Sequence, residues 1–137
     1  MTVFCSDLKR ARETAKIAFS KNIIIDKRLR EIDYGRLTKK NEAEIKAFMS
    51  KAIDKSFPYG ESYEQVAERM KSFLDEASEK YGGRKIAVVA HQAPQLALEV
   101  LLNHKTWQQA MAEDWRNKKA WQAGWPYEVR GGPKIWD

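Results

Sequence analysis

The sequence predicts an α/β fold with a mostly parallel sheet, and two pairs of neighbouring segments carry this prediction. The runs Val3–Cys5 and Ile86–Ala90 are short and apolar, as expected of buried strands. Each run is followed within a few residues by a segment whose apolar residues recur at helical spacing. Strands that alternate with helices in this way are typical of parallel sheets covered by helices.

The first pair places an arginine at the end of a strand. Ser6 and Asp7 follow the strand and are residue types that favour a helix N-cap. Helical spacing then follows in Leu8, Ala11, Ala15 and Ala18. Arg10 therefore falls in the first helical turn, beyond the carboxyl end of a strand, where open α/β sheets bind ligands. Such an arginine attracts anions, phosphate above all, although a solvent-exposed basic helix start explains this segment equally well.

The second pair places a histidine in an equivalent position. The run Ile86–Ala90 is predicted to be a fully buried, parallel strand, and His91 follows it immediately. Pro94 suits the first turn of the helix that comes next. A single histidine is more often structural than catalytic. At the carboxyl end of a buried strand, however, His91 is well placed to meet a ligand.

A third segment, Phe57–Met70, predicts a helix start with an acidic residue just before it. Ser62 and Gln65 have the spacing of a capping box, so the helix is expected to begin at Tyr63 and to end at Gly82. Its apolar stripe is Val66, Met70, Phe73, Leu74, Ala77 and Tyr81. Glu61 then either complements the helix dipole or donates a proton across a cleft, and the spacing alone favours the first interpretation.

The remaining elements are expected to complete one domain. Residues 41 to about 56 are predicted to be helical, with Asn41 and Glu44 resembling a cap pair. Residues 125–130 are predicted to be a final strand. Four tryptophans in the last third of the chain are expected to pack as core and clamp residues around a helix: Trp107, Trp115, Trp121 and Trp125.

These segments together resemble the histidine phosphatase superfamily, the phosphoglycerate mutase-like proteins. The family motif SDLxRAxxTA is similar to residues 6–15 here, and its GES turn to residues 60–62. The strand-end histidine of the family corresponds to His91, and residues 29–35, LREIDYG, are similar to its L-x-E-x-x-x-G segment. The resemblance extends from about Thr2 to Leu102 and keeps the order of the motifs.

The resemblance implies a phosphoglycerate mutase-like three-layer sandwich and one domain over residues 1–137. It also implies hydrolysis or transfer at phosphate monoesters through a phosphohistidine, with a phosphorylated small molecule as partner. In that scheme Arg10 clamps the phosphate, His91 is the second histidine of the phosphate pocket, and Glu61 protonates the leaving alcohol. Ser6, at the same strand end, is expected to bind phosphate with Arg10 and His91.

One family motif has no counterpart in the sequence. The family's first strand ends in Arg-His-Gly, whose histidine becomes phosphorylated, but the two histidines here, His91 and His104, lie in other contexts. We therefore expect an N-terminally truncated member that lacks the first βα unit and the nucleophile. Loss of a covalent nucleophile commonly removes several orders of magnitude of rate. A phosphatase-family domain of weak or no activity and a non-catalytic phospho-ligand-binding or interaction domain both remain open.

Composition limits the other classes of function. The net charge is +6 over 137 residues, but basic and acidic residues interleave and no nucleic-acid motif occurs, so nucleic-acid binding is not expected. No apolar run is long enough to cross a bilayer, and no signal-peptide pattern is visible. The lone Cys5 suits a buried site in a cytoplasmic protein. Zinc-ligand spacing, a Walker loop and a dinucleotide glycine loop are all absent, so no metal and no cofactor are expected.

The missing strand has a structural consequence as well. In the family's sheet this strand lies between the His91 strand and the final strand. Without it, backbone donors and acceptors and apolar side chains are left at an open edge. Three outcomes are open: the flanking strands close up, a second chain supplies the pairing, or the fold is partly molten. Of these we expect self-association of the chain through the exposed sheet edge.

Overall fold

Three parallel strands form the centre of the molecule. The computed structural model describes residues 1–20, 22–118, 122 and 124–129. Strands β1 (Thr2–Cys5), β2 (Ile23–Ile25) and β3 (Ile86–Val89) lie in one sheet in the order β2-β1-β3. Both pairings are parallel, and Phe4 of β1 lies beside Ile24 on one side and Val88 on the other. The predicted α/β class with a parallel sheet is confirmed.

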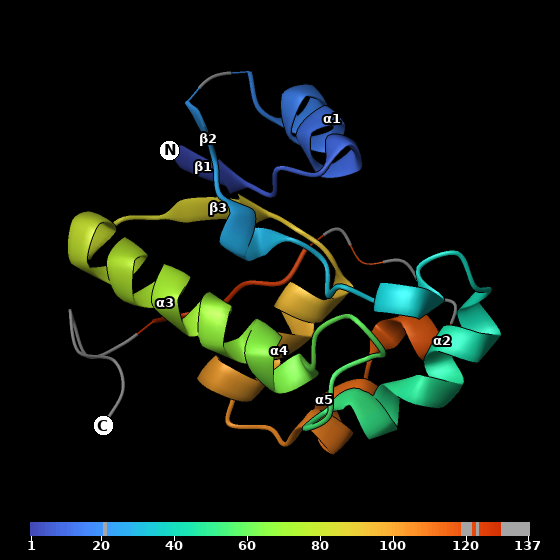
Figure 1. The fold of residues 1–137 in the computed structure, drawn as a ribbon. Helices are drawn as coiled ribbons and strands as arrows, with labels where there is room; N and C mark the ends of the chain where they lie inside the picture. The colour runs from blue at the N-terminus through green and yellow to red at the C-terminus, as the bar shows by residue number, and fades with distance from the viewer. Residues whose placement is uncertain (21, 119–121, 123, 130–137) are drawn as a thin grey trace.

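Helices cover the sheet on two sides, which gives three layers (Figure 1). Side chains alternate along β1, so Cys5 packs with Ala11 and Ala15 of helix α1 (Lys9–Ala18). On the opposite face, Phe4 meets Phe73 of helix α3 (Tyr63–Tyr81) edge to face, with ring centroids 5.1 Å apart. Helix α4 (Gln92–Leu102) packs on α3 in the same layer. Cys5 is fully buried, as predicted from its place at the strand end.

Helix α3 begins and ends where its sequence predicts. The Ser62 hydroxyl accepts from the Gln65 amide, and the Gln65 side chain accepts from the Ser62 amide, which completes the predicted capping box. The helix ends at Tyr81 with Gly82 as its C-cap residue. All six residues of its predicted stripe pack in the main core: Val66, Met70, Phe73, Leu74, Ala77 and Tyr81.

The segment between β2 and α3 is made of short elements. Three 3₁₀ turns, η1 (Lys27–Leu29), η2 (Gly35–Leu37) and η3 (Ser50–Ala52), flank helix α2 (Glu42–Met49). The Asn41 side chain caps α2 by accepting from the Glu44 amide, as predicted. The expected helix to about residue 56 was too long, because the α-helix gives way to a 3₁₀ turn after Met49.

The predicted final strand at residues 125–130 is wrong for residues 125–129, and Arg130 lies outside the described residues. The segment carries no ladder of hydrogen bonds, and Pro126 has no amide to donate to one. Side chains hold it instead. The Tyr127 hydroxyl accepts from the Gln95 side chain at 2.7 Å and donates to Glu99 at 3.0 Å, so α4 anchors the segment.

Two tryptophan contacts agree with the expected packing of the C-terminal third. Trp107, the first residue of helix α5 (Trp107–Ala112), is buried against Tyr63. Trp115, in the 3₁₀ turn η4 (Trp115–Lys118), packs on Trp125 with ring centroids 5.6 Å apart. Trp121 lies outside the described residues.

Strand β3 is less buried than predicted, and β2 is also exposed. The expectation of a fully buried β3 is wrong, because Val88 is 36% exposed and the other β3 residues are only partly buried. Within the described part of the chain, β3 pairs with β1 alone, so its outer edge is open. On β2, at the opposite edge, Ile24 and Ile25 are also exposed. No helix in the described ranges is both long and apolar enough to cross a membrane.

Candidate functional site

The carboxyl ends of β1 and β3 bring two predicted site residues into contact. The strands run parallel in register, with Cys5 beside Val89, so the residues that follow them emerge at the same edge of the sheet. The Ser6 amide donates to the Val89 carbonyl at 2.9 Å. Ser6 Oγ lies 2.8 Å from His91 Nε2 and joins the two chain segments side chain to side chain.

Ser6 is fully buried, and its hydroxyl is used inside the protein. Besides contacting His91, Ser6 Oγ accepts from the Leu8 amide at 3.2 Å. The expectation that Ser6 or Asp7 is the N-cap of α1 is wrong, because the helix begins one residue later and Leu8 holds the cap position. The Asp7 carboxylate instead receives two hydrogen bonds from the Arg30 guanidinium, at 2.7 and 2.6 Å. Ser6 therefore holds the His91 ring in place.

Arg10 lies in the first turn of α1, as predicted, and its side chain is exposed. No hydrogen bond or ion pair of its guanidinium occurs among the described residues. Its positive charge nevertheless contributes to the lowered pKa of His91, and it partly opposes the rise that burial causes in the pKa of Glu31. The guanidinium therefore acts on the space at the ends of β1 and β3. An arginine that is exposed and without a partner is free to bind an anion.

His91 precedes the first turn of α4 as its N-cap residue, with Pro94 in that turn as predicted. Burial disfavours the charged imidazolium, and the nearby charge of Arg10 disfavours it further. These two effects lower the pKa of His91 to about 4. The side chain is therefore a neutral imidazole at neutral pH, when no anion is bound.

Glu31 is a site residue that we missed, although it lies in the LREIDYG segment. Glu31 Oε1 accepts from the Ala93 amide in the first turn of α4 at 2.8 Å, and from the Ile32 amide at 3.1 Å. Burial raises the pKa of Glu31 above its ordinary value, despite these two hydrogen bonds. Carboxyl groups whose pKa is perturbed in this way occur often at functional sites, so Glu31 is a candidate for proton transfer. The signal in the sequence was its place three residues before Tyr34-Gly35, in a segment between two elements.

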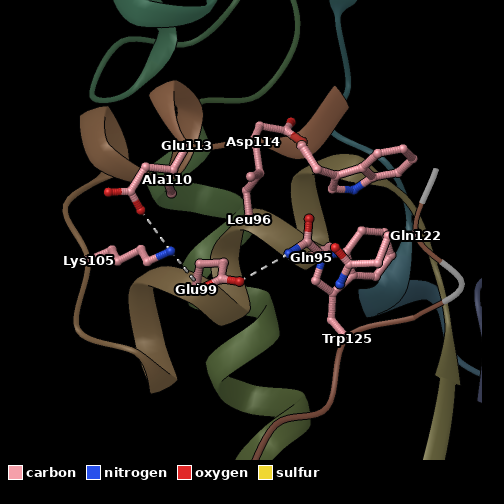
Figure 2. A pocket seen from close by; sticks show the side chains of 10 residues that line it. Gln95, Leu96, Glu99, Lys105, Ala110, Glu113, Asp114, Gln122 and Trp125 are labelled. Carbon is pink, nitrogen blue, oxygen red and sulfur yellow. Dashed lines mark hydrogen bonds and ion pairs between the residues drawn. The ribbon is translucent and has the colours of Figure 1, made fainter. Parts of the chain in front are cut away.

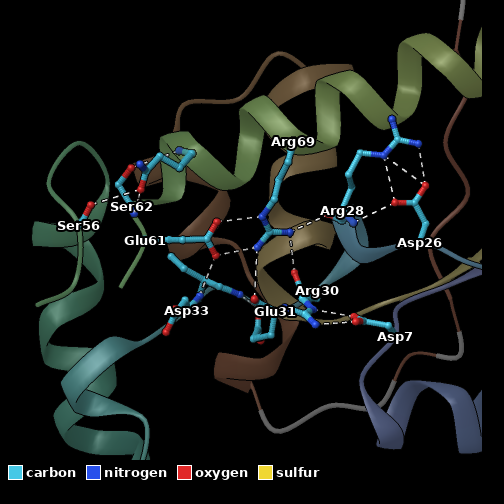
Figure 3. Close-up of polar contacts among 12 residues, drawn as sticks. Asp7, Asp26, Arg28, Arg30, Glu31, Asp33, Ser56, Glu61, Ser62 and Arg69 are labelled. Carbon is cyan, nitrogen blue, oxygen red and sulfur yellow. Dashed lines mark hydrogen bonds and ion pairs between the residues drawn. The ribbon is translucent and has the colours of Figure 1, made fainter. Parts of the chain in front are cut away.

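Glu61 faces a different environment (Figure 3). Its two carboxylate oxygens receive hydrogen bonds from Nε and a terminal nitrogen of Arg69, both at 3.0 Å, and Oε1 also accepts from the Asp33 amide at 2.9 Å. Burial alone raises the pKa of Glu61, but these hydrogen bonds outweigh it and hold the pKa below its ordinary value. The carboxylate is therefore ionised at neutral pH and already bonded on both oxygens.

A pocket of about 190 Å³ lies elsewhere on the surface (Figure 2). It is lined by residues of α4, α5 and the following segment, and its lining includes none of Arg10, Glu31 and His91. Lys105 in its wall is paired with Glu99 at 3.3 Å and with Glu113 at 2.9 Å. Since these charges satisfy one another, we place the candidate site at the strand ends and not in this pocket.

The motifs at the strand ends are part of a longer match. Residues 1–119 match the histidine phosphatase superfamily (branch 1). The chain belongs to this superfamily. Two relatives within the superfamily illustrate the similarity. The chain is 33% identical over 104 residues to a metal-independent phosphoserine phosphatase of Arabidopsis thaliana, which covers 66% of this chain and 44% of the relative. It is 40% identical over 84 residues to fructose-2,6-bisphosphatase TIGAR of Xenopus tropicalis. This match covers 53% of this chain and 30% of the relative.

Solved histidine phosphatase-fold structures agree with the fold described here. A mycobacterial glucosyl-3-phosphoglycerate phosphatase, solved in complex with VO3, superposes with a TM-score of 0.65 at 26% identity. The match covers 82% of this chain and 62% of that chain. This histidine phosphatase-family chain thus spans less than half of the length of the two curated relatives, and less than two thirds of this solved one.

Proposed function

We propose that the chain binds the phosphate group of a phosphate monoester, as part of a histidine phosphatase-type site. The observation that carries the proposal is the Ser6–His91 contact, which joins the ends of β1 and β3. Arg10 lies in the first turn of α1, shortly after β1, and Glu31 accepts from the Ala93 amide two residues after His91. The Arg10 guanidinium has no hydrogen bond or ion pair among the described residues, and its charge acts on both His91 and Glu31. Relatives named for phosphoserine and for fructose 2,6-bisphosphate support a phosphorylated small molecule as ligand.

Each site residue has a role that follows from its chemistry and its surroundings. Arg10 presents a planar set of donors that fits two phosphate oxygens at once. His91 is next to the ligand and changes charge when the ligand binds, because a bound anion favours the imidazolium. The expected direct contact of Ser6 with phosphate stays a prediction; its buried hydroxyl supports the role of orienting the His91 ring.

For the proton donor we propose Glu31 in place of Glu61. A donor must carry its proton near the working pH, and burial raises the pKa of Glu31 in that direction. Glu61 has a lowered pKa and both of its carboxylate oxygens accept from Arg69, so it carries no proton to donate at neutral pH. In this proposal the GES turn does not contact the ligand, and its Glu61 acts on the site through Arg69.

The chemical step needs a nucleophile that this sequence does not supply in the family's form. Both of its histidines follow residues other than arginine: Ala90 before His91, and Asn103 before His104. We propose that the chain by itself turns over phosphate esters weakly or not at all. The alternative function is a non-catalytic domain that binds a phospho-ligand or a protein.

Turnover of a generic phosphate ester, together with protection by inorganic phosphate against thermal unfolding, tests both functions. Phosphate protection that Arg10→Ala removes supports the binding site, and turnover that His91→Ala abolishes supports phosphoryl transfer. Protection without turnover favours the non-catalytic function. Equal unfolding temperatures with and without phosphate, with no turnover, would contradict the phosphate site.

We also propose that the open edge of β3 pairs with a second copy of the chain. Backbone groups of an edge strand can continue a sheet, and Val88 adds exposed apolar surface. A cytoplasmic location, no cofactor and no binding of nucleic acid remain our predictions from the sequence.

A further inference from the structure

Arg69 uses its whole guanidinium inside the protein (Figure 3). Its five N–H groups reach five acceptors: both carboxylate oxygens of Glu61 and the backbone carbonyls of Arg28, Arg30 and Glu31. The donor–acceptor distances lie between 2.7 and 3.2 Å. Because an arginine side chain has five N–H donors, none is left for a ligand.

The segment that Arg69 holds has no hydrogen-bond ladder of its own. Residues 30–34 connect η1 to η2 without helix or strand. Backbone carbonyls in such a segment have no partner within a helix or sheet, and Arg69 supplies one for Arg30 and one for Glu31. The guanidinium therefore replaces the regular backbone pairing that would otherwise fix the course of this segment.

Glu61 extends the same set of contacts to the other side of Glu31. Glu61 Oε1 accepts from the Asp33 amide, and the Glu61 amide donates to the Asp33 carbonyl at 2.8 Å. Gly60 makes this approach possible, because a Cβ atom there would lie 2.1 Å from the Asp33 carbonyl oxygen. The GES turn is thus hydrogen-bonded to Asp33, two residues after Glu31. Arg69 is hydrogen-bonded to Glu31 itself and to the residues before it.

Glu31 is consequently held at both ends. Its carbonyl accepts from Arg69 on α3, and its side chain accepts from the Ala93 amide on α4. We propose that Arg69 and Glu61 form a clamp that positions the Glu31 carboxyl against the first turn of α4, beside His91. Both are positioning residues, and this role rests on the proposed function of Glu31.

The clamp explains why arginine is needed at position 69. A lysine keeps the charge, but its three donors on a single nitrogen cannot span five acceptors in a planar fork. Arg69→Lys is therefore the sharpest variant, since it removes the geometry and keeps the positive charge. Glu61→Gln is the second variant, because it keeps the carbonyl oxygen for the Asp33 amide and loses the charged partner of Arg69.

Arg28→Lys is a matched control. Arg28 also ties the chain before Glu31 to α3, through Ser72 and Glu76, but its side chain contacts none of residues 30–34 in the described structure. The reporter is the Ala93 amide in a ¹⁵N-labelled protein, because Glu31 accepts from it directly. Its chemical shift against pH reads the ionisation of Glu31 without turnover.

In the natural chain the Ala93 amide should titrate with a pKa above the ordinary 4.5 of a glutamate, and inorganic phosphate should raise it further. In Arg69→Lys we expect the pKa to fall towards the ordinary value of a glutamate and the response to phosphate to be lost, while the amide spectrum stays that of a folded protein. Glu61→Gln should show an intermediate shift, and Arg28→Lys none.

An unchanged titration in folded Arg69→Lys and Glu61→Gln overturns the clamp, even if both variants melt at lower temperature. Should Arg69→Lys fail to fold, Glu61→Gln alone decides by the same criterion. A natural chain whose Glu31 and His91 signals ignore phosphate would contradict the proposed function instead. The phosphate-free titrations would still judge the clamp in that case.

Discussion

Ser6 Oγ lies 2.8 Å from His91 Nε2, although the two residues are 85 positions apart in the sequence. This contact joins the ends of β1 and β3, and it depends on the parallel register that places Cys5 beside Val89. Ser6 is buried and His91 is partly accessible, so the hydroxyl holds the ring on its side that faces the protein interior.

Removing this hydroxyl should loosen His91. For Ser6→Ala we expect a loss of about 1–3 kcal/mol in the free energy of unfolding, because the Leu8 amide and His91 Nε2 both lose their partner. Protection by phosphate should also weaken. Chemical denaturation and the NMR signals of the His91 ring measure the two effects. Ser20→Ala, at an exposed position after α1, is the control and should change neither. A His91 ring with unchanged signals in Ser6→Ala would contradict the orienting role.

The neutral state of His91 predicts a dependence of stability on pH. The pKa of His91 is about 4 in the folded protein, below its ordinary 6.5. Between these two values the unfolded chain binds more protons than the folded one, so the stability contributed by His91 is complete above pH 6.5 and is lost as the pH falls towards 4. Unfolding at pH 7, 5.5 and 4.5 should show this loss, and His91→Gln should show less of it. Parallel curves for the two proteins would refute the lowered pKa.

The free guanidinium of Arg10 should account for anion binding. We expect Arg10→Ala to weaken phosphate binding by about tenfold or more, equivalent to ~1.4 kcal/mol. Its unfolding temperature without phosphate should stay near that of the natural chain, because Arg10 makes no side-chain hydrogen bond in the described structure. Arg12→Ala on the same helix, also exposed, is the matched control. Equal phosphate affinities of the two variants would argue against a site at Arg10.

Glu31 and Glu61 should respond differently when the carboxyl is replaced by an amide. Glu31→Gln removes the titrating group next to the proposed anion site and keeps an oxygen for the Ala93 amide, so phosphate affinity should stay level at neutral pH and lose its dependence on the protonation of Glu31. Glu61→Gln should cost about 1–2 kcal/mol of stability, because Arg69 loses a charged acceptor. Isothermal titration with phosphate and urea unfolding of both variants check these expectations. The assignment is wrong if Glu61→Gln is as stable as the natural chain.

The open edge of β3 predicts an oligomer that one charge can dissociate. Val88→Lys puts a charged side chain on the edge, a common way for proteins to prevent strand pairing. We expect light scattering after size exclusion to show the natural chain as a dimer or larger species and the variant as a monomer. Val129→Lys is the control, because Val129 is also exposed but lies outside the sheet. This variant should leave the mass of the species in solution unchanged. A natural chain that is monomeric at all concentrations would reject this contact.

Local signals in the sequence predicted the parts of the fold that local contacts determine. The capping box of Ser62 and Gln65 depends only on residues three apart, and the prediction was confirmed at the residue. The prediction of a final strand was wrong at residues 125–129 because a strand requires a partner, and no local pattern shows whether one is available. The predicted burial of Val88 was wrong for a related reason. Its apolar run indicates burial but not which edge of the sheet stays open.

The site was predicted in part for the same physical reason. Arg10 and His91 follow strands that end at one edge, so topology alone brings them near each other. Glu31 reaches the site through an irregular segment whose course is set by Arg69 from 38 residues further along the chain. Nothing in the spacing of Glu31 reveals that arginine, whereas the Gly60-Glu61 turn draws attention because it lies next to a strong cap.

The five hydrogen bonds of Arg69 also tie the dynamics of residues 30–34 to those of α3. Irregular segments usually exchange their amide hydrogens through small local openings. Here, release of the Asp33 amide requires Glu61 to move, and Glu61 is bonded to a helix whose apolar face is buried. Segment and helix should therefore open as one cooperative unit. The amide of Asp33 should then exchange at a rate close to that of the first turns of α3, far slower than its lack of regular structure suggests.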